Sequence, residues 1–73
     1  MDMRKLVGRN VKGQRLRLNL TQEQLAERAG ISQQYISGLE GGRRNPTILT
    51  LFELAVALGS TPMELLNPAA NPD

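Results

Sequence analysis

Residues 33–38, QQYISG, bring together side-chain amides and a hydroxyl without any charge. Gln33, Gln34 and Ser37 can each donate and accept hydrogen bonds, and glutamine pairs well with N6 and N7 of adenine in the major groove of DNA. Taken alone, the pattern fits two interpretations, which are recognition of base edges and ordinary solvation of a surface helix.

Two adjacent arginines follow this stretch in a loop that lies between glycines and Pro46. Arg43, Arg44 and Asn45 all carry groups that bind phosphate oxygens, and such contacts set the register of a protein on DNA rather than its sequence preference. Tyr35 has two readings, because it could contact a phosphate or thymine methyl, or instead brace its own helix.

The surrounding residues predict two short helices joined by a tight turn. Thr21 starts a capping-box pattern, and Gly30 suits the end of that first helix because glycine readily adopts positive φ. Ser32 is the expected N-cap of the second helix. Ile36 and Leu39 are its inward residues, so that its polar side chains face outward.

The string LTQEQLAERAGISQQYISGLEGGRRNPTILTLFELAVALG carries an ordered set of features, which are Gln22, Leu25-Ala26, Gly30, Ser32, Ile36-Ser37, Leu39-Glu40, Gly42, Pro46 and the run from Leu54 to Leu58. This set, over about residues 6–66, resembles the helix-turn-helix of the phage-repressor and Cro family, the XRE-like regulators. The resemblance implies an all-α, compact five-helix domain that reads double-stranded DNA with its third helix, about residues 33–40, in transcriptional control.

The resemblance also implies roles for residues outside that helix. Gln22 would clamp a phosphate at a helix N-terminus, where backbone N–H groups point outward. Arg15 would form a bidentate bridge with Glu40 that fixes the third helix on the first; the alternative is a phosphate contact by Arg15. Gly38 departs from the bulkier residues often found in the family at that place, which leaves fewer side chains for specificity.

These considerations give a candidate interface. The expected base-contacting residues are Gln33, Gln34, Ser37 and Gly38. The expected phosphate-contacting residues are Gln22, Tyr35, Arg43, Arg44, Asn45 and Arg17.

Composition excludes several other classes of protein. The 73 residues include no cysteine or histidine, which rules out a disulfide framework and the usual thiolate or imidazole metal sites. A serine nucleophile would lack an imidazole base, and no glycine-rich phosphate loop precedes a helix. We therefore expect no enzyme activity, metal or cofactor. No signal peptide or membrane-spanning run occurs, which predicts a cytoplasmic, bacterial or phage-encoded protein.

The charges are unevenly distributed along the chain. Residues 1–44 hold all nine basic side chains and carry a net charge of +5, whereas residues 45–73 hold no basic residue and carry −3. This asymmetry favours one part of the molecule facing phosphates.

The flanking segments predict three more helices in a domain of residues 1–67. After a frayed start at residues 1–5, the first helix covers about 6–18, with Val7, Val11 and Leu18 as its apolar stripe. The fourth helix runs from Thr47 to about Leu58, and the fifth begins with the capping signals of residues 61–64. The expected core residues of these two helices are Ile48, Leu51, Leu54, Ala55, Leu58, Met63, Leu65 and Leu66. Residues 68–73 would be a disordered tail or the start of a linker.

The fourth helix carries a second apolar strip formed by Leu49, Phe52 and Val56. An excess of apolar surface on a small domain often marks a partner surface, here the interface of a homodimer on an inverted repeat. The alternative is that the N-terminal residues or the tail cover the strip. A competing function is a protein-interaction module, either an antitoxin-like partner or a regulatory adaptor, because fold alone does not decide function.

Overall fold

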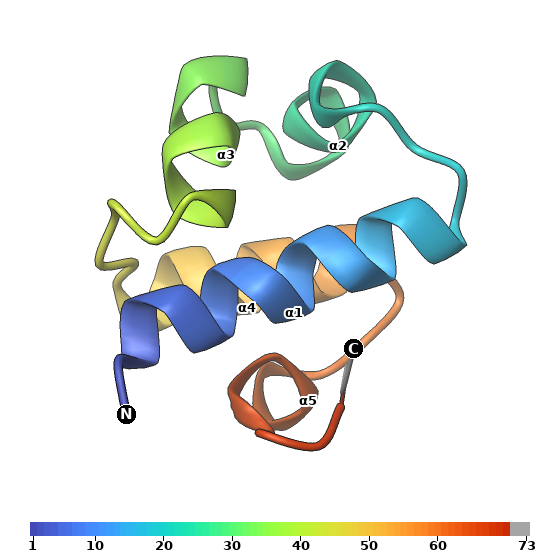
Figure 1. Cartoon of the computed structure of the whole chain (residues 1–73). Helices are drawn as coiled ribbons and strands as arrows, with labels where there is room; N and C mark the ends of the chain where they lie inside the picture. The colour runs from blue at the N-terminus through green and yellow to red at the C-terminus, as the bar shows by residue number, and fades with distance from the viewer. Residues whose placement is uncertain (71–73) are drawn as a thin grey trace.

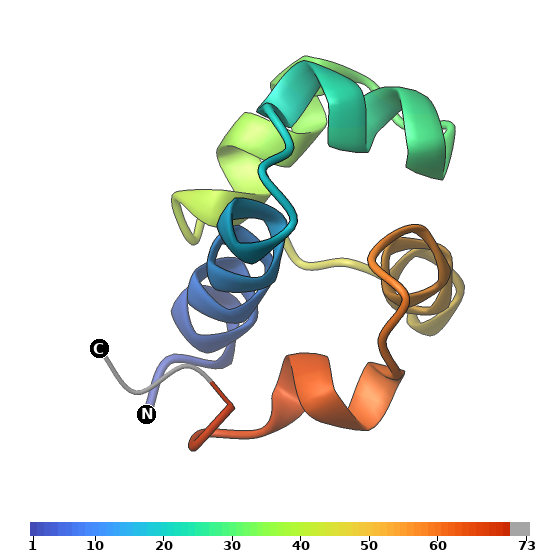
Figure 2. The same cartoon turned by 90° about the vertical axis from the view of Figure 1, so that its right-hand side faces the viewer.

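The computed structural model describes residues 1–70. Its elements are α1 (Met3–Arg17), α2 (Gln22–Ala29), α3 (Gln33–Glu40), α4 (Ile48–Ala57) and α5 (Pro62–Leu66). The expected all-α, five-helix fold is confirmed, and the described residues contain no strand. In Figure 1, α1 crosses the molecule with α2 and α3 on one side of it and α5 on the other. Figure 2 shows α1 and α4 flanking the interior.

Side-chain caps define where the helices begin. The hydroxyls of Thr21, Ser32, Thr47 and Thr61 each accept a hydrogen bond from the backbone N–H three residues later. Gln24 completes the capping box, since its Oε1 accepts from the Thr21 N–H at 2.8 Å. Each such cap contributes about 1 kcal/mol, so the helix starts are encoded locally.

The predicted frayed start of α1 is wrong. The helix begins at Met3, because the carboxylate of Asp2 accepts hydrogen bonds from the N–H groups of Arg4 and Lys5 at 3.0 and 3.4 Å. Desolvation alone would raise the pKa of Asp2, but these hydrogen bonds and the charge of Arg4 bring that pKa below its usual value. An N-terminal aspartate is thus a working helix cap.

The other end of α1 also differs from the prediction. The helix ends at Arg17, and Leu18 is 45% exposed rather than part of the apolar stripe. Asn19 has φ 57°, a left-handed conformation that is common after the end of a helix and that asparagine tolerates. The chain turns there and buries Leu20 instead.

One hydrophobic core joins the five helices. Its centre consists of side chains without measurable exposure, which are Val11, Leu25, Ile36, Leu39, Leu54 and Leu65. Buried Asn10 ties α5 to α1, because its Nδ2 donates to the carbonyls of Leu65 and Asn67, both at 2.9 Å. None of the described helices is long and apolar enough to cross a bilayer.

Three residues expected in the core are exposed instead. Ile48 is 87% exposed and Met63 77%, while Leu66 lies at the edge of the core. Ile48 opens the first turn of α4, four residues before exposed Phe52, and therefore lies on the solvent side of the helix.

Candidate nucleic-acid interface

The α2–turn–α3 unit is anchored in the core, which leaves one side of α3 facing outward. Gly30 ends α2 with φ 70°, and the N–H of Ile31 donates to the carbonyl of Ala26 at 3.0 Å. Ile36 and Leu39 have no exposed surface and fix the inner side of α3. In Figure 1, α3 and α2 form one edge of the molecule.

The outer side of α3 carries the predicted polar residues. Gln33 and Gln34 are exposed and Ser37 is half-buried, all within the first two turns of the helix. Gln33 Nε2 donates to Gln22 Oε1 at 3.0 Å, so that the first residues of α2 and α3 are joined side chain to side chain. The bound amide of Gln33 still has one N–H and its carbonyl oxygen available.

The expected pairing of Arg15 with Glu40 is present beneath this surface. Arg15 Nε and Nη2 donate to the two carboxylate oxygens of Glu40 at 2.6 and 3.0 Å. Arg15 Nη1 donates to the carbonyl of Leu20 at 2.7 Å, and only 9% and 4% of the two side chains are exposed. Gln22 Nε2 also donates to Glu40 at 3.0 Å. A continuous polar chain therefore runs from Arg15 through Glu40 and Gln22 to Gln33.

Gly8 sets how closely α1 approaches α3, a role that the sequence did not reveal. A Cβ at this position would overlap the carbonyl oxygen of Leu39 and lie 3.0 Å from that of Glu40. The glycine weakens α1 as an isolated helix, but only glycine lets the backbones come together here. No local sequence pattern predicts this contact, because the two contacting segments are about thirty residues apart in the chain.

The loop after α3 holds its two arginines against the helix. Gly42 has a positive φ of 77°, and Arg43, Arg44 and Asn45 are exposed. The guanidinium carbon of Arg44 lies 5.2 Å from the centre of the Tyr35 ring. The N–H of Arg43 donates to the Gly38 carbonyl at 2.9 Å.

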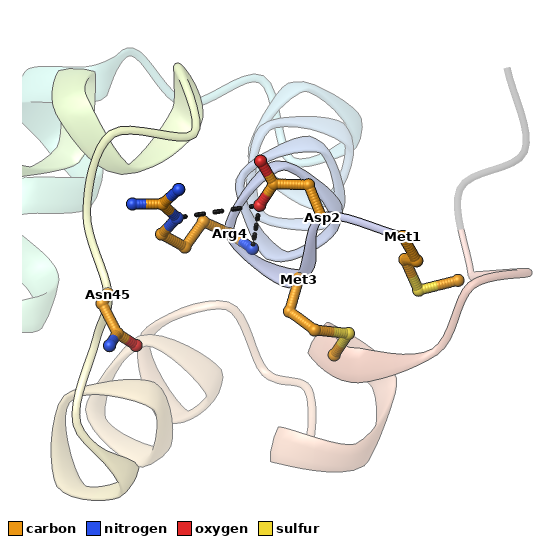
Figure 3. A pocket seen from close by; sticks show the side chains of 5 residues that line it. All are labelled: Met1, Asp2, Met3, Arg4 and Asn45. Atoms are coloured by element: carbon orange, nitrogen blue, oxygen red, sulfur yellow. Dashed lines mark hydrogen bonds and ion pairs between the residues drawn. The ribbon is translucent and has the colours of Figure 1, made fainter.

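Asn45 lies farther along the loop and faces the start of α1. Figure 3 shows Asn45 and Arg4 on the wall of one open hollow, which Met1, Asp2 and Met3 complete. Arg4 Nε is 3.7 Å from the Asp2 carboxylate. The amide of Asn45 therefore shares its surroundings with the N-terminus rather than with α3.

Two of the predicted DNA-contacting residues, Arg17 and Gly38, have different surroundings from the others. Arg17 Nη2 donates to the carbonyl of Ala70 at 3.0 Å, so Arg17 lies at the C-terminal segment rather than within the group around Gln22 and Gln33. Gly38 lies on the outer half of α3 but is buried, because the side chain of Arg44 covers it.

Residues 68–70, the start of the expected tail, turn back toward α1. The carbonyl of Pro68 accepts from Arg9 Nη2 at 3.0 Å, as that of Ala70 does from Arg17. The rest of the expected tail, residues 71–73, lies outside the described residues.

The apolar strip of α4 is open to solvent. Leu49, Phe52 and Val56 are each more than half exposed, and Ile48 extends the strip toward the start of the helix. Within residues 1–70, neither the N-terminal residues nor the C-terminal segment covers it, so the internal-cover alternative fails for the described chain.

Comparison with known proteins identifies the fold and its family. The family model described as Helix-turn-helix (HTH_3) matches residues 11–66, which include the α2–turn–α3 unit and the Arg15–Glu40 bridge. The chain belongs to this helix-turn-helix family. The resemblance to the XRE-like regulators that the sequence indicated is therefore confirmed, and with it membership of a family of DNA-binding transcription regulators.

Two curated relatives match most of this helix-turn-helix chain. It is 59% identical over 68 residues to y4dJ, an uncharacterized HTH-type transcriptional regulator of Sinorhizobium fredii, covering 93% of this chain and 88% of the relative. It is 42% identical over 66 residues to the control protein C.SmaI of Serratia marcescens, covering 90% of this chain and 79% of the relative.

A solved structure agrees with the fold. The hypothetical transcription factor NHTF from Neisseria superposes with a TM-score of 0.89 at 31% identity, covering 93% of this chain and 78% of that one.

Proposed function

We propose that the chain binds double-stranded DNA of a specific sequence, as a homodimer, with α3 in the major groove, and thereby controls transcription. One observation carries the proposal: the outer face of α3 presents uncharged hydrogen-bonding groups, while the buried Arg15–Glu40 bridge locks its inner face. Direct base readout requires a rigid helix whose N-terminal end still has amide N–H and carbonyl groups available. The regulator names of the relatives support the same function.

The proposed base contacts lie in the first two turns of α3. Gln33, Gln34 and Ser37 are the proposed base contacts, and the remaining N–H and carbonyl of Gln33 suit the N7 and N6 positions of adenine. Gly38 can contribute only through its backbone or through the side chain that covers it.

Phosphate contacts flank this region on two sides. Gln22 at the start of α2 would bind one phosphate, and Tyr35, Arg43, Arg44 and Asn45 would bind others beyond the end of α3. Arg17, which donates to the Ala70 carbonyl, would bind a phosphate away from this group.

The exposed strip on α4 supports the dimer. A second copy of the chain that packs its own Leu49, Phe52 and Val56 against the strip would bury apolar surface now in water. Two-fold symmetry would then make the operator an inverted repeat with half-sites about 10 bp apart or a multiple of it. We propose residues 1–67 as the DNA-binding domain and the cytoplasm as its place of action.

Selection from a random pool of duplexes at about 150 mM salt tests the proposal. Enrichment of an inverted repeat is the expected result. Enrichment of a single half-site would retain the DNA function and remove the dimer, and no enrichment by the folded protein would overturn the proposed function.

The exposed α4 strip also favours a second candidate function, binding of a different protein through an apolar surface. Salt distinguishes the two functions. The affinity for DNA falls steeply as the salt concentration rises, because phosphate contacts release counterions. The affinity for a protein partner bound through an apolar surface should not fall in this way.

A further inference from the structure

The side chain of Arg44 lies along α3 instead of extending into solvent. A Cβ built on Gly38 would lie 3.1 Å from Nε, 3.3 Å from Cγ and 3.7 Å from Cδ of Arg44. The guanidinium also lies over the ring of Tyr35, at 5.2 Å from its centre. Two residues of α3, three positions apart, thus hold one arginine of the following loop.

Glycine at position 38 is not required by the backbone. It sits inside α3, and its φ is not among the positive values found at Gly30, Gly42 and Gly59. The three heavy atoms nearest to an added Cβ all belong to Arg44. The arginine is therefore the neighbour that a side chain at position 38 would displace.

The placement matters because α3 itself has no basic residue. Gln34 precedes Gly38 by four residues, so the two lie one turn apart on the same side of the helix. Because Gly38 has no side chain, Arg44 lies directly against α3, and its guanidinium lies over the Tyr35 ring at the exposed surface of the helix. The loop thereby supplies the positive charge and the forked donors that α3 lacks.

We propose that Gly38 is a positioning residue for DNA binding: together with the Tyr35 ring it forms a seat that holds Arg44 against the DNA-facing side of α3. The inference rests on the proposed function. A seated arginine has already lost much of its rotamer freedom in the free protein, so ordering it on DNA costs less. Gly38 therefore contributes to affinity through Arg44 although it has no side chain.

The test compares Gly38→Ala with wild type on a duplex of the sequence that wild type selects from a random pool. Alanine is the better helix former, so the melting temperature is expected to stay equal or rise. The affinity for the duplex is expected to fall on the order of tenfold, which is within the range of coupling between two residues that contact each other, here Gly38 and Arg44.

Double variants separate the seat from any contact made by the new methyl group. In an Arg44→Ala background, Gly38→Ala is expected to cause no further loss of affinity. In a matched Arg43→Ala background, where the neighbouring arginine is removed instead, the full loss from Gly38→Ala should remain.

The proposal would be overturned if Gly38→Ala bound the duplex as tightly as wild type does, or if Gly38→Ala lowered the affinity as much in the Arg44→Ala background as in wild type. A lowered melting temperature of Gly38→Ala would also overturn it, because the added methyl would then contact a group less flexible than the Arg44 side chain.

A measurement without DNA tests the position of Arg44 independently of the proposed function. The ¹⁵N heteronuclear NOE of the Arg44 Nε–H should be high in the free wild type and fall in Gly38→Ala. If wild type selects no duplex, the proposed function fails, while the NOE still decides whether the seat exists; equal NOE values would overturn it.

Discussion

Arg15 and Glu40 place two opposite charges beneath the outer face of α3, where their side chains have very little contact with water. Their bidentate bridge, the Leu20 carbonyl and Gln22 together satisfy most of their hydrogen-bonding groups. Removing one partner leaves the other charge buried without compensation, which is far more costly than losing an exposed charge.

Arg15→Ala and Glu40→Ala should each lower the free energy of unfolding by about 3–5 kcal/mol, the range for breaking a buried pair. Lys12→Ala, which removes an exposed charge from the same helix, is the matched control and should stay within about 0.5 kcal/mol of wild type. Urea denaturation measures all three variants. Equal midpoints for Arg15→Ala, Glu40→Ala and wild type would contradict a stabilising bridge.

Gly8→Ala should destabilise the protein by about 1–3 kcal/mol, the typical cost of overpacking. The new methyl meets the backbone carbonyls of Leu39 and Glu40, which cannot move aside as a flexible side chain can. Gly38→Ala is the natural comparison, because there the same substitution meets only Arg44 and should not lower stability. Thermal unfolding of the two variants checks this difference in sign, and a Gly8→Ala protein as stable as wild type would refute the close contact.

At the scale of the elements, sequence predicted what is encoded locally. The four hydroxyl caps were identified from their own few residues. The start of α1 was missed although Asp2 carries the same kind of signal, a side-chain oxygen that accepts hydrogen bonds from backbone N–H groups of the first turn.

Contacts between elements were much less predictable. Helical periodicity finds apolar stripes on α4 but does not say how far round the helix the core extends, so Ile48 was placed inside. The family resemblance supplied the Arg15–Glu40 pair, whereas the roles of Gly8 and Gly38 depend on which segments meet in three dimensions. Each glycine leaves room for a neighbouring segment, and the local sequence pattern around the glycine does not identify that segment.

The α3 helix and the loop after it are expected to differ in what they contribute to binding. Gln33→Ala should relax preference at one base position, with a loss of about 1–3 kcal/mol on the selected sequence only. Arg43→Ala should weaken binding to all duplexes alike and reduce the salt slope by about 1. Affinities for selected and scrambled duplexes at several salt concentrations measure both effects. Identical profiles for the two variants would contradict the division between base and phosphate contacts.

The whole molecule presents two chemically different surfaces on separate elements. The outer side of α3 and the loop after it carry the polar and basic groups, whereas α4 carries the apolar strip and lies at another edge of the molecule. The charge asymmetry of the sequence follows this division, since all basic residues precede α4. Each surface can therefore be altered without changing the other.

Phe52→Glu places a charge in the middle of the apolar strip, where burial against a second copy would leave it unpaired. We expect this variant to sediment as a monomer at concentrations at which wild type is a dimer, with an unchanged melting temperature under monomeric conditions because Phe52 is exposed. Its affinity for an inverted repeat should fall to that for a single half-site, since the second half-site no longer adds an effectively intramolecular contact. Glu53→Ala, one position along α4 and outside the strip, should behave as wild type. If Phe52→Glu still sediments as a dimer, the interface lies elsewhere on the molecule, and Leu49, Phe52 and Val56 are left for a different partner.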